Sequence, residues 1–123
     1  TDIKYVFESE NLIELVEIVK QTSQSVFPVL DLNKNVIGSI DINKNRAIFL
    51  NAFNIKFTTT KSIIQPLTYF VRQNESMECV MNTFDKSNLD VLLVLKNNNC
   101  IGYLTKINVL TVYRAKLKEM IIE

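Results

Sequence analysis

Hydrophobic and polar positions form the same pattern twice along this chain. Each copy has an apolar segment, a polar turn and a second apolar segment that carries a glycine. The first copy consists of residues 26–30, 33–35 and 36–40, and the second of residues 91–95, 97–99 and 100–104. Gly38 and Gly102 are the two glycines of the chain, and they occupy the same place in each copy. The pattern predicts two equivalent β-hairpins.

An amphipathic helix is predicted before each hairpin. Apolar residues recur at helical spacing in both copies, as Leu12, Leu15, Val16 and Val19 and as Met77, Val80, Met81 and Phe84. Asn11 and Glu14 predict a capping box that starts a helix running to about residue 22. Ser76 predicts the N-cap of the second helix, which runs to about residue 87.

Weaker patterns complete two repeats. The predicted strands are residues 4–7 and 69–71, and the predicted helices are residues 43–51 and 106–122. We therefore predict an α+β fold with β-α-β-β-α repeats over residues 1–52 and 66–123, joined by a linker at 53–65. Because one such unit cannot cover its own apolar face, the two copies are expected to pack on each other.

Composition indicates a folded core and points away from several partners. Hydrophobic residues make up 47% of the 123 residues, and the net charge is +1 with no basic face evident, so a nucleic-acid partner is not indicated. No apolar run reaches the roughly 18 residues of a membrane helix. Cys79 and Cys100 fall in a helical and a strand pattern, and we interpret both as reduced core residues.

The chain lacks the residues that most catalytic and metal sites require. The chain has no histidine, its two cysteines lie in different copies, and its two glycines cannot form a phosphate loop. Glu10, Glu14 and Glu17 share one face of the first helix, and a solvated face is the simpler interpretation than a catalytic pair. The last helix is an ordinary surface helix or a partner-facing seam. We expect no enzyme activity.

The doubled unit resembles a known family. Phe-Pro-Val-Leu-Asp at residues 27–31, followed by Val-Ile-Gly at 36–38, is close to the usual first hairpin of tandem cystathionine-β-synthase-type (CBS) domains. The resemblance covers nearly the whole chain. It implies a CBS pair, or Bateman module, in which the two repeats pack about a pseudo-twofold axis.

A narrower resemblance lies in the second copy. Residues 76–81 and 102–106, followed by residues 109–117 with Tyr113-Arg114, are similar to the C-terminal cytoplasmic region of bacterial voltage-gated chloride-channel-type (ClC) proteins. This resemblance implies a non-catalytic regulatory and dimerisation module that biases gating or transport by an attached chloride-channel-like membrane domain. The alternative is an adenine-nucleotide-sensing CBS module of a soluble enzyme or of a different transporter.

The family resemblance also implies candidate ligand residues. In nucleotide-binding CBS pairs the residues three and six positions after each strand glycine hold phosphate and ribose, and here they are Asp41 and Lys44, then Thr105 and Asn108. Thr105, Asn108 and Asp41 are therefore the candidates for a degenerate nucleotide cleft, with no catalytic or metal-binding residue. Since neither copy has the ribose-binding Asp, we expect no cofactor and weak or no binding of adenine nucleotides. Thr105 and Asp41 also suit helix caps that bind no ligand.

Assembly and location follow from the same resemblance. We expect a homodimer, with Met77, Met81, Tyr113 and Leu117 as candidates for apolar packing within or between chains. The chain has no initiator methionine and opens near a predicted strand, so we expect it to be the C-terminal part of a longer protein. The second expected partner is thus a covalently attached upstream membrane domain, which places the module at the cytoplasmic face of the cell membrane.

Overall fold

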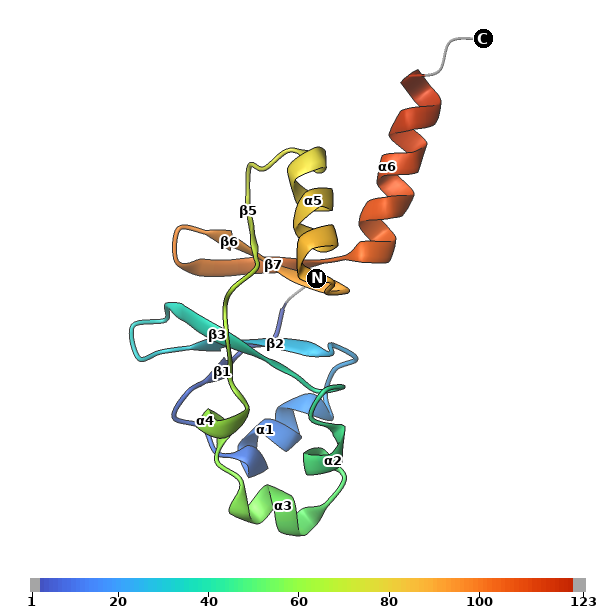
Figure 1. The fold of residues 1–123 in the computed structure, drawn as a ribbon. Coiled ribbons are helices and arrows are strands. Elements are labelled where there is room, and N and C mark those ends of the chain that lie inside the picture. The colour runs from blue at the N-terminus through green and yellow to red at the C-terminus, as the bar shows by residue number, and fades with distance from the viewer. Residues whose placement is uncertain (1–2, 121–123) are drawn as a thin grey trace. The chain divides into compact units, whose positions relative to one another are not determined.

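Two compact units make up the protein. The computed structural model describes residues 3–120, apart from the side chains of residues 52–54. The chain divides into Thr1–Leu67, which we call unit 1, and Thr68–Glu123, which we call unit 2. Each unit has its own sheet and its own helices (Figure 1).

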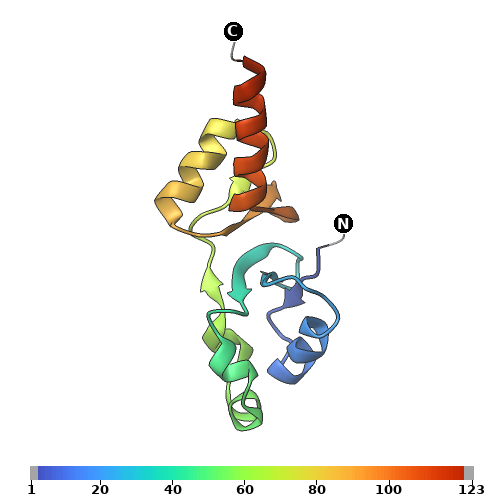
Figure 2. The same ribbon diagram turned by 90° about the vertical axis from the view of Figure 1, so that its right-hand side faces the viewer.

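Unit 1 is a four-stranded sheet with helices on one face (Figures 1 and 2). Its elements are β1 (Val6–Phe7), α1 (Leu12–Val19), β2 (Val26–Leu30), β3 (Val36–Asp41), α2 (Arg46–Phe49), α3 (Ala52–Phe57), α4 (Thr60–Ile63) and β4 (Gln65–Pro66). The strand order is β1-β2-β3-β4. β1 runs parallel to β2, whereas β2–β3 and β3–β4 are antiparallel.

Unit 2 repeats the first three strands. Its elements are β5 (Val71–Arg72), α5 (Met77–Ser87), β6 (Val91–Lys96), β7 (Asn99–Thr105) and α6 (Lys106–Met120). The strand order is β5-β6-β7, with β5 parallel to β6 and β6 antiparallel to β7. Both helices follow the order that the sequence predicts, and the C-terminal half of α6 runs past the end of α5 (Figures 1 and 2).

The strand registers of the two hairpins are equivalent. Gly38 lies opposite Val29 in unit 1, and Gly102 lies opposite Val94 in unit 2. Each hairpin also has a register shift immediately after that valine, between Val29 and Leu30 and between Val94 and Leu95. Such a bulge bends a strand and increases its twist. The predicted sequence repeat is therefore confirmed, and the repeat includes an equivalent bulge in each hairpin.

The predicted helix starts are also confirmed. The Glu14 N–H donates to Asn11 Oδ1 at 2.8 Å, and the Asn11 N–H donates to Glu14 Oε1 at 3.4 Å, which completes the capping box. Ser76 Oγ accepts the Cys79 N–H at 3.2 Å at the start of α5. α1 ends at Val19, before the predicted residue 22, because the chain then tightens into turns with i to i−3 hydrogen bonds.

The segment between the two hairpins differs from the prediction. Residues 53–65 were expected to form a linker, yet they hold most of α3 and all of α4, and β4 begins at Gln65. Ile63 is buried in the unit 1 core, and Ile55 and Ile64 pack against it, so burial of these side chains orders the segment. The helix expected over residues 43–51 is only Arg46–Phe49. The repeat bounds 1–52 and 66–123 stay a prediction.

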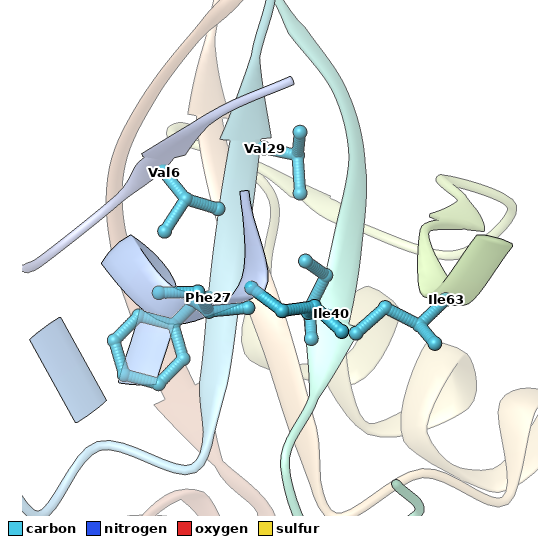
Figure 3. Close-up of a cluster of buried hydrophobic side chains, with 7 residues drawn as sticks. Val6, Phe27, Val29, Ile40 and Ile63 are labelled. Atoms are coloured by element: carbon cyan, nitrogen blue, oxygen red, sulfur yellow. The ribbon is translucent and has the colours of Figure 1, made fainter. Parts of the chain in front are cut away.

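Each unit has its own hydrophobic core. The buried residues of the first core are Val6, Leu12, Leu15, Phe27, Val29, Ile40 and Ile63, and those of the second are Val71, Val80, Phe84, Leu92 and Val109. Figure 3 shows Ile63 of α4 beside Ile40 of β3, with Phe27 of β2 on the other side of Ile40. Phe27 and Phe84 have no exposed surface, and each contributes about 1.5–3 kcal/mol by its burial.

The interpretation of both cysteines as core residues is wrong for Cys79. Cys79 is exposed on α5, whereas Cys100 is half-buried in β7, and both are free thiols. The α5 core stripe consists of Val80 and Phe84, with Met77 and Met81 packed against it, and residue 79 lies outside this stripe. The face of α1 with Glu17 is solvated, because Glu17 pairs with Lys20 at 3.5 Å with both side chains largely exposed.

A candidate ligand cavity in unit 2

A cavity of about 350 Å³ lies in unit 2 between the sheet and the starts of α5 and α6. Its lining residues come from five elements and one loop, and they are Val71, Arg72, Gln73, Glu75, Met77, Val80, Val94, Leu104, Asn108, Val109 and Val112. Most of these side chains are aliphatic, and the polar ones are Arg72, Gln73, Glu75 and Asn108. An apolar cavity with a few polar groups is the usual form of a small-molecule site, and it suits a ligand with a flat or aliphatic body and a polar edge.

The connection between β5 and α5 is a closed turn at this cavity. The Glu75 carboxylate accepts the backbone N–H of Arg72, and the Glu75 N–H donates to the Arg72 carbonyl at 3.2 Å. The Arg72 guanidinium lies 5.2 Å from the centroid of the Phe70 ring, within cation–π range. The turn therefore holds a cation and a carboxylate in fixed backbone positions at the cavity.

The same turn occurs in unit 1, where Glu10 Oε1 accepts the Phe7 N–H at 3.0 Å and the Glu10 N–H donates to the Phe7 carbonyl at 3.0 Å. Glu10 and Glu75 are equivalent residues of the two copies. The sequence patterns considered above do not predict this role for either glutamate. The signal was present, because the same residue type recurs at the repeat spacing, just before each predicted helix.

Thr105 and Asn108 are brought together at the start of α6. Thr105 Oγ1 accepts the Asn108 N–H at 3.3 Å, which is the hydrogen bond of an N-cap. Asn108 lines the cavity, whereas Thr105 does not. The Thr105 hydroxyl therefore positions the first turn of α6, and with it Asn108, at the cavity wall.

Asp41 takes the equivalent position in unit 1. Its Oδ1 accepts the Lys44 N–H at 3.2 Å, the counterpart of the bond between Thr105 and Asn108. The Asp41 carbonyl also accepts a hydrogen bond from Asn45 Nδ2 at 2.8 Å. Both the side chain and the backbone of Asp41 therefore stabilise the turn before α2. Lys44 itself is exposed. A ligand role for Asp41, Thr105 or Asn108 stays a prediction.

The part of the chain that the structure describes contains neither a metal-binding cluster nor a membrane-spanning helix. Residues 3–120 contain no cluster of three or more His, Cys, Asp or Glu side chains that could hold a metal ion. Within the same range, none of the helices combines the length and the hydropathy that crossing a bilayer requires.

Comparison with known proteins gives a likeness in structure and none in sequence. Neither a protein-family model nor the sequence of a curated protein matches the chain. The CBS domain of a CBS-domain-containing membrane protein from Sphaerobacter thermophilus matches in structure, with a TM-score of 0.74 and 15% identity over 90% of this chain and 82% of that one. The chain has the fold of a CBS domain pair.

Two further CBS structures agree. CBSX2 in complex with AMP has a TM-score of 0.72 and 21% identity over 97% of this chain and 90% of that one. The CBS domain of a bacterial CNNM/CorC family Mg²⁺ transporter has a TM-score of 0.73 and 17% identity over 89% of this chain and 66% of that one. At such identities the likeness shows the fold alone. It confirms the α+β fold that the repeated pattern predicts and the CBS-pair fold that the family resemblance implies.

Proposed function

We propose that this CBS pair is a non-catalytic regulatory module, which alters the activity of a domain joined to it in the same protein. The observation that carries the proposal is the CBS-pair fold, since this fold is also that of a domain of a membrane protein and of a domain of an Mg²⁺ transporter. The cavity in unit 2 supplies a place where a small ligand can bind one arrangement of the module better than another.

For the attached domain we propose a chloride-channel-like membrane transport domain upstream, with the module at the cytoplasmic face of the membrane. The similarity of residues 109–117 to the C-terminal region of ClC proteins supports this assignment. The reading frame that contains the chain provides the first test. Several apolar runs of about 20 residues are expected in it, and a frame without them would refute the channel assignment while leaving the CBS fold intact.

The regulatory role is tested on the whole protein. Transport by the full-length protein is compared with transport by a version that lacks residues 1–123. We expect transport to persist after the deletion with a changed rate or voltage dependence. A deletion that leaves the transport rate and its dependence unaltered would contradict the regulatory role.

A second function, the sensing of adenine nucleotides, is favoured by the cavity and by the AMP complex of CBSX2. In this alternative the attached domain is a soluble enzyme or a different transporter. Asn108 stands where the resemblance places an aspartate, and a neutral amide gives weaker hydrogen bonds to a ribose diol than a carboxylate does. We therefore propose that AMP, ADP and ATP bind weakly, with Asn108 and the cap residue Thr105 as the candidates in unit 2 and Asp41 as the candidate in unit 1.

Calorimetric titration with AMP tests this site. Asn108→Asp is expected to tighten AMP binding about 10- to 150-fold, because it restores one charge-assisted hydrogen bond. The matched control is Asn98→Asp, which adds the same charge in the exposed turn of the second hairpin and should leave AMP affinity unchanged. An unchanged affinity of Asn108→Asp would remove the site assignment, and low-micromolar affinity of the unaltered chain would overturn weak binding.

A further inference from the structure

The helices of unit 1 lie in a segment that carries positive charge and no acidic residue. Between Asp41 and Glu75 the sequence contains five basic residues and neither Asp nor Glu. Because the whole chain has a net charge of only +1, the remaining residues are net negative. Four of the five basic residues, Lys44, Arg46, Lys56 and Lys61, lie before or within α2, α3 and α4, and all four are exposed.

Acidic side chains do not neutralise these four cations. In the described range, residues 3–120, none of the four has a carboxylate within ion-pair distance. Arg46 Nη2 donates to a neutral acceptor, Asn43 Oδ1, at 3.2 Å. α1 contacts α3 and carries two glutamates, but Glu14 is held in the capping box and Glu17 is paired with Lys20. The positive charge of the α2–α4 region is therefore available to a partner.

The same region exposes two large apolar side chains. Leu50, in the connection between α2 and α3, is 79% exposed, and Phe57, at the end of α3, is 66% exposed. Lys56 Nζ lies 5.8 Å from the centroid of the Phe57 ring, so a cation and an aromatic ring are adjacent. α2 and α3 contact each other, and Figures 1 and 2 show α3 at the end of unit 1 that lies away from the sheet.

From this combination we propose that the basic-apolar surface of unit 1 docks on an anionic phospholipid bilayer. We define this surface by its residues, which are Lys44, Arg46, Leu50, Lys56, Phe57 and Lys61. Phe and Leu side chains enter the boundary between headgroups and acyl chains, while Lys and Arg stay at the level of the lipid phosphates. A nucleic-acid backbone would use the cations but would leave Leu50 without a role. The proposal does not depend on the ligand cavity or on the identity of an attached domain.

Vesicle co-sedimentation of the 123-residue chain tests the proposal. We expect binding to phosphatidylcholine vesicles that contain about 30% phosphatidylglycerol, no binding to pure phosphatidylcholine, and weaker binding as salt is raised. The double variant Lys56→Gln, Lys61→Gln is expected to lower the partition coefficient about 30-fold. Leu50→Ser and Phe57→Ser are each expected to weaken binding several-fold without changing the charge.

The matched control is Lys116→Gln with Lys118→Gln, which removes two exposed charges from α6 and should bind as the unaltered chain does. Circular dichroism shows whether each variant keeps its helices. An equal loss in the control variant, or equal binding to uncharged vesicles, would overturn the proposal. Failure to bind any vesicle would also overturn the proposal, and an acidic protein would then be the favoured partner of this surface. If the chain binds heparin or duplex DNA and Leu50→Ser and Phe57→Ser leave that affinity unchanged, the bilayer proposal is overturned in favour of a general polyanion site.

Discussion

Gly38 and Gly102 are equivalent residues, yet only Gly38 is closely packed. A Cβ atom on Gly38 would overlap the Gln65 carbonyl oxygen and would lie 2.8 Å from Ile64 Cγ2, whereas a Cβ atom on Gly102 would meet nothing within 4 Å. The difference arises because β4 pairs with β3 at Gly38, while no strand of the described sheet pairs with the outer edge of β7. Packing, rather than backbone conformation, therefore requires a glycine at position 38.

We predict that Gly38→Ala lowers the free energy of unfolding by about 1–3 kcal/mol, because the added methyl group pushes β4 away from β3. Gly102→Ala is the matched control and should change this free energy by less than about 0.5 kcal/mol. Urea denaturation followed by circular dichroism measures both. Equal losses in the two variants would show that the fit of β4 against Gly38 does not set the requirement.

The two cysteines give a second prediction at the residue scale. Burial raises the pKa of the Cys100 thiol above its ordinary value, and hydrogen bonds with the backbone of Gly102 and Val94 offset only part of this rise. A raised pKa means that at a given pH less Cys100 is thiolate than in an unburied thiol. Since the thiolate is the nucleophile, alkylation of Cys100 is displaced to higher pH.

We therefore expect iodoacetamide to modify the exposed Cys79 before Cys100 in the unaltered chain. In the Cys79→Ser variant, the alkylation rate of Cys100 should rise with pH at a higher midpoint than that of glutathione in the same experiment. Mass spectrometry follows both reactions. A Cys100 midpoint at or below that of glutathione would contradict the effect of burial.

At the scale of elements, the Gln24 side chain joins the segment before β1 to the start of β2 by hydrogen bonds. The Gln24 side chain is buried, and its Oε1 accepts the Lys4 N–H at 2.9 Å. Its Nε2 donates to the carbonyls of Lys4 and Val26 at 2.7 and 2.8 Å. β1 pairs with β2 through only Val6 and Phe7, so this side chain extends a very short parallel contact.

Replacing Gln24 should therefore weaken unit 1. We predict that Gln24→Leu lowers the free energy of unfolding by about 1–3 kcal/mol, because backbone groups of Lys4 and Val26 lose their partner. Gln21→Leu, at an exposed position of the same connection, is the control and should change it by less than about 0.5 kcal/mol. Thermal and urea denaturation report the difference, and similar values for the two variants would contradict this role.

Sequence patterns predicted the elements whose signals are local. The caps at Asn11 and Ser76 and the glycine-bearing hairpins depend on residues within a few positions of each other, and all are confirmed. α3, α4 and β4 were missed because packing of Ile63 into the unit 1 core and pairing with β3 decide their structure. Such long-range contacts leave no periodic signal in a short segment.

The candidate site shows the same division. Asn108 and Thr105 were found because the family resemblance fixes their distance from Gly102 along the chain. Arg72 and Val112 line the cavity as well, but they belong to β5 and α6 and come together only in the folded unit. A cavity wall assembled from several elements cannot be read from one segment of sequence.

At the scale of the whole molecule, α6 indicates assembly. It has 15 residues, and Val109 is the one that is buried. Met77 and Met81 of α5 pack against the unit 2 core, whereas Leu117 remains 43% exposed and Ile107 76% exposed. Large apolar side chains that stay exposed on a helix mark a surface that another protein covers. We propose that a second copy of the chain covers α6, with Tyr113 and Leu117 at the contact.

Sedimentation at tens of micromolar is therefore expected to give the mass of a homodimer. Leu117→Glu should weaken the dimer at least about 10-fold, because it places a charge in an apolar contact. Lys118→Glu, on the adjacent and exposed position, is the control and should leave the dimer mass unchanged. A monomer mass for the unaltered chain would contradict the assembly.

The separate cores of the two units have a consequence for local unfolding and amide hydrogen exchange. Every buried residue of the first core lies between Val6 and Ile63, and every buried residue of the second lies between Val71 and Val109. Because the residues of each core come from one unit, we predict that each unit behaves as its own cooperative block in amide hydrogen exchange. Amides of β2 and β3 should then exchange faster in Gly38→Ala while those of β6 and β7 keep their protection. Amides of unit 1 can thus lose protection from exchange while those of unit 2 keep it.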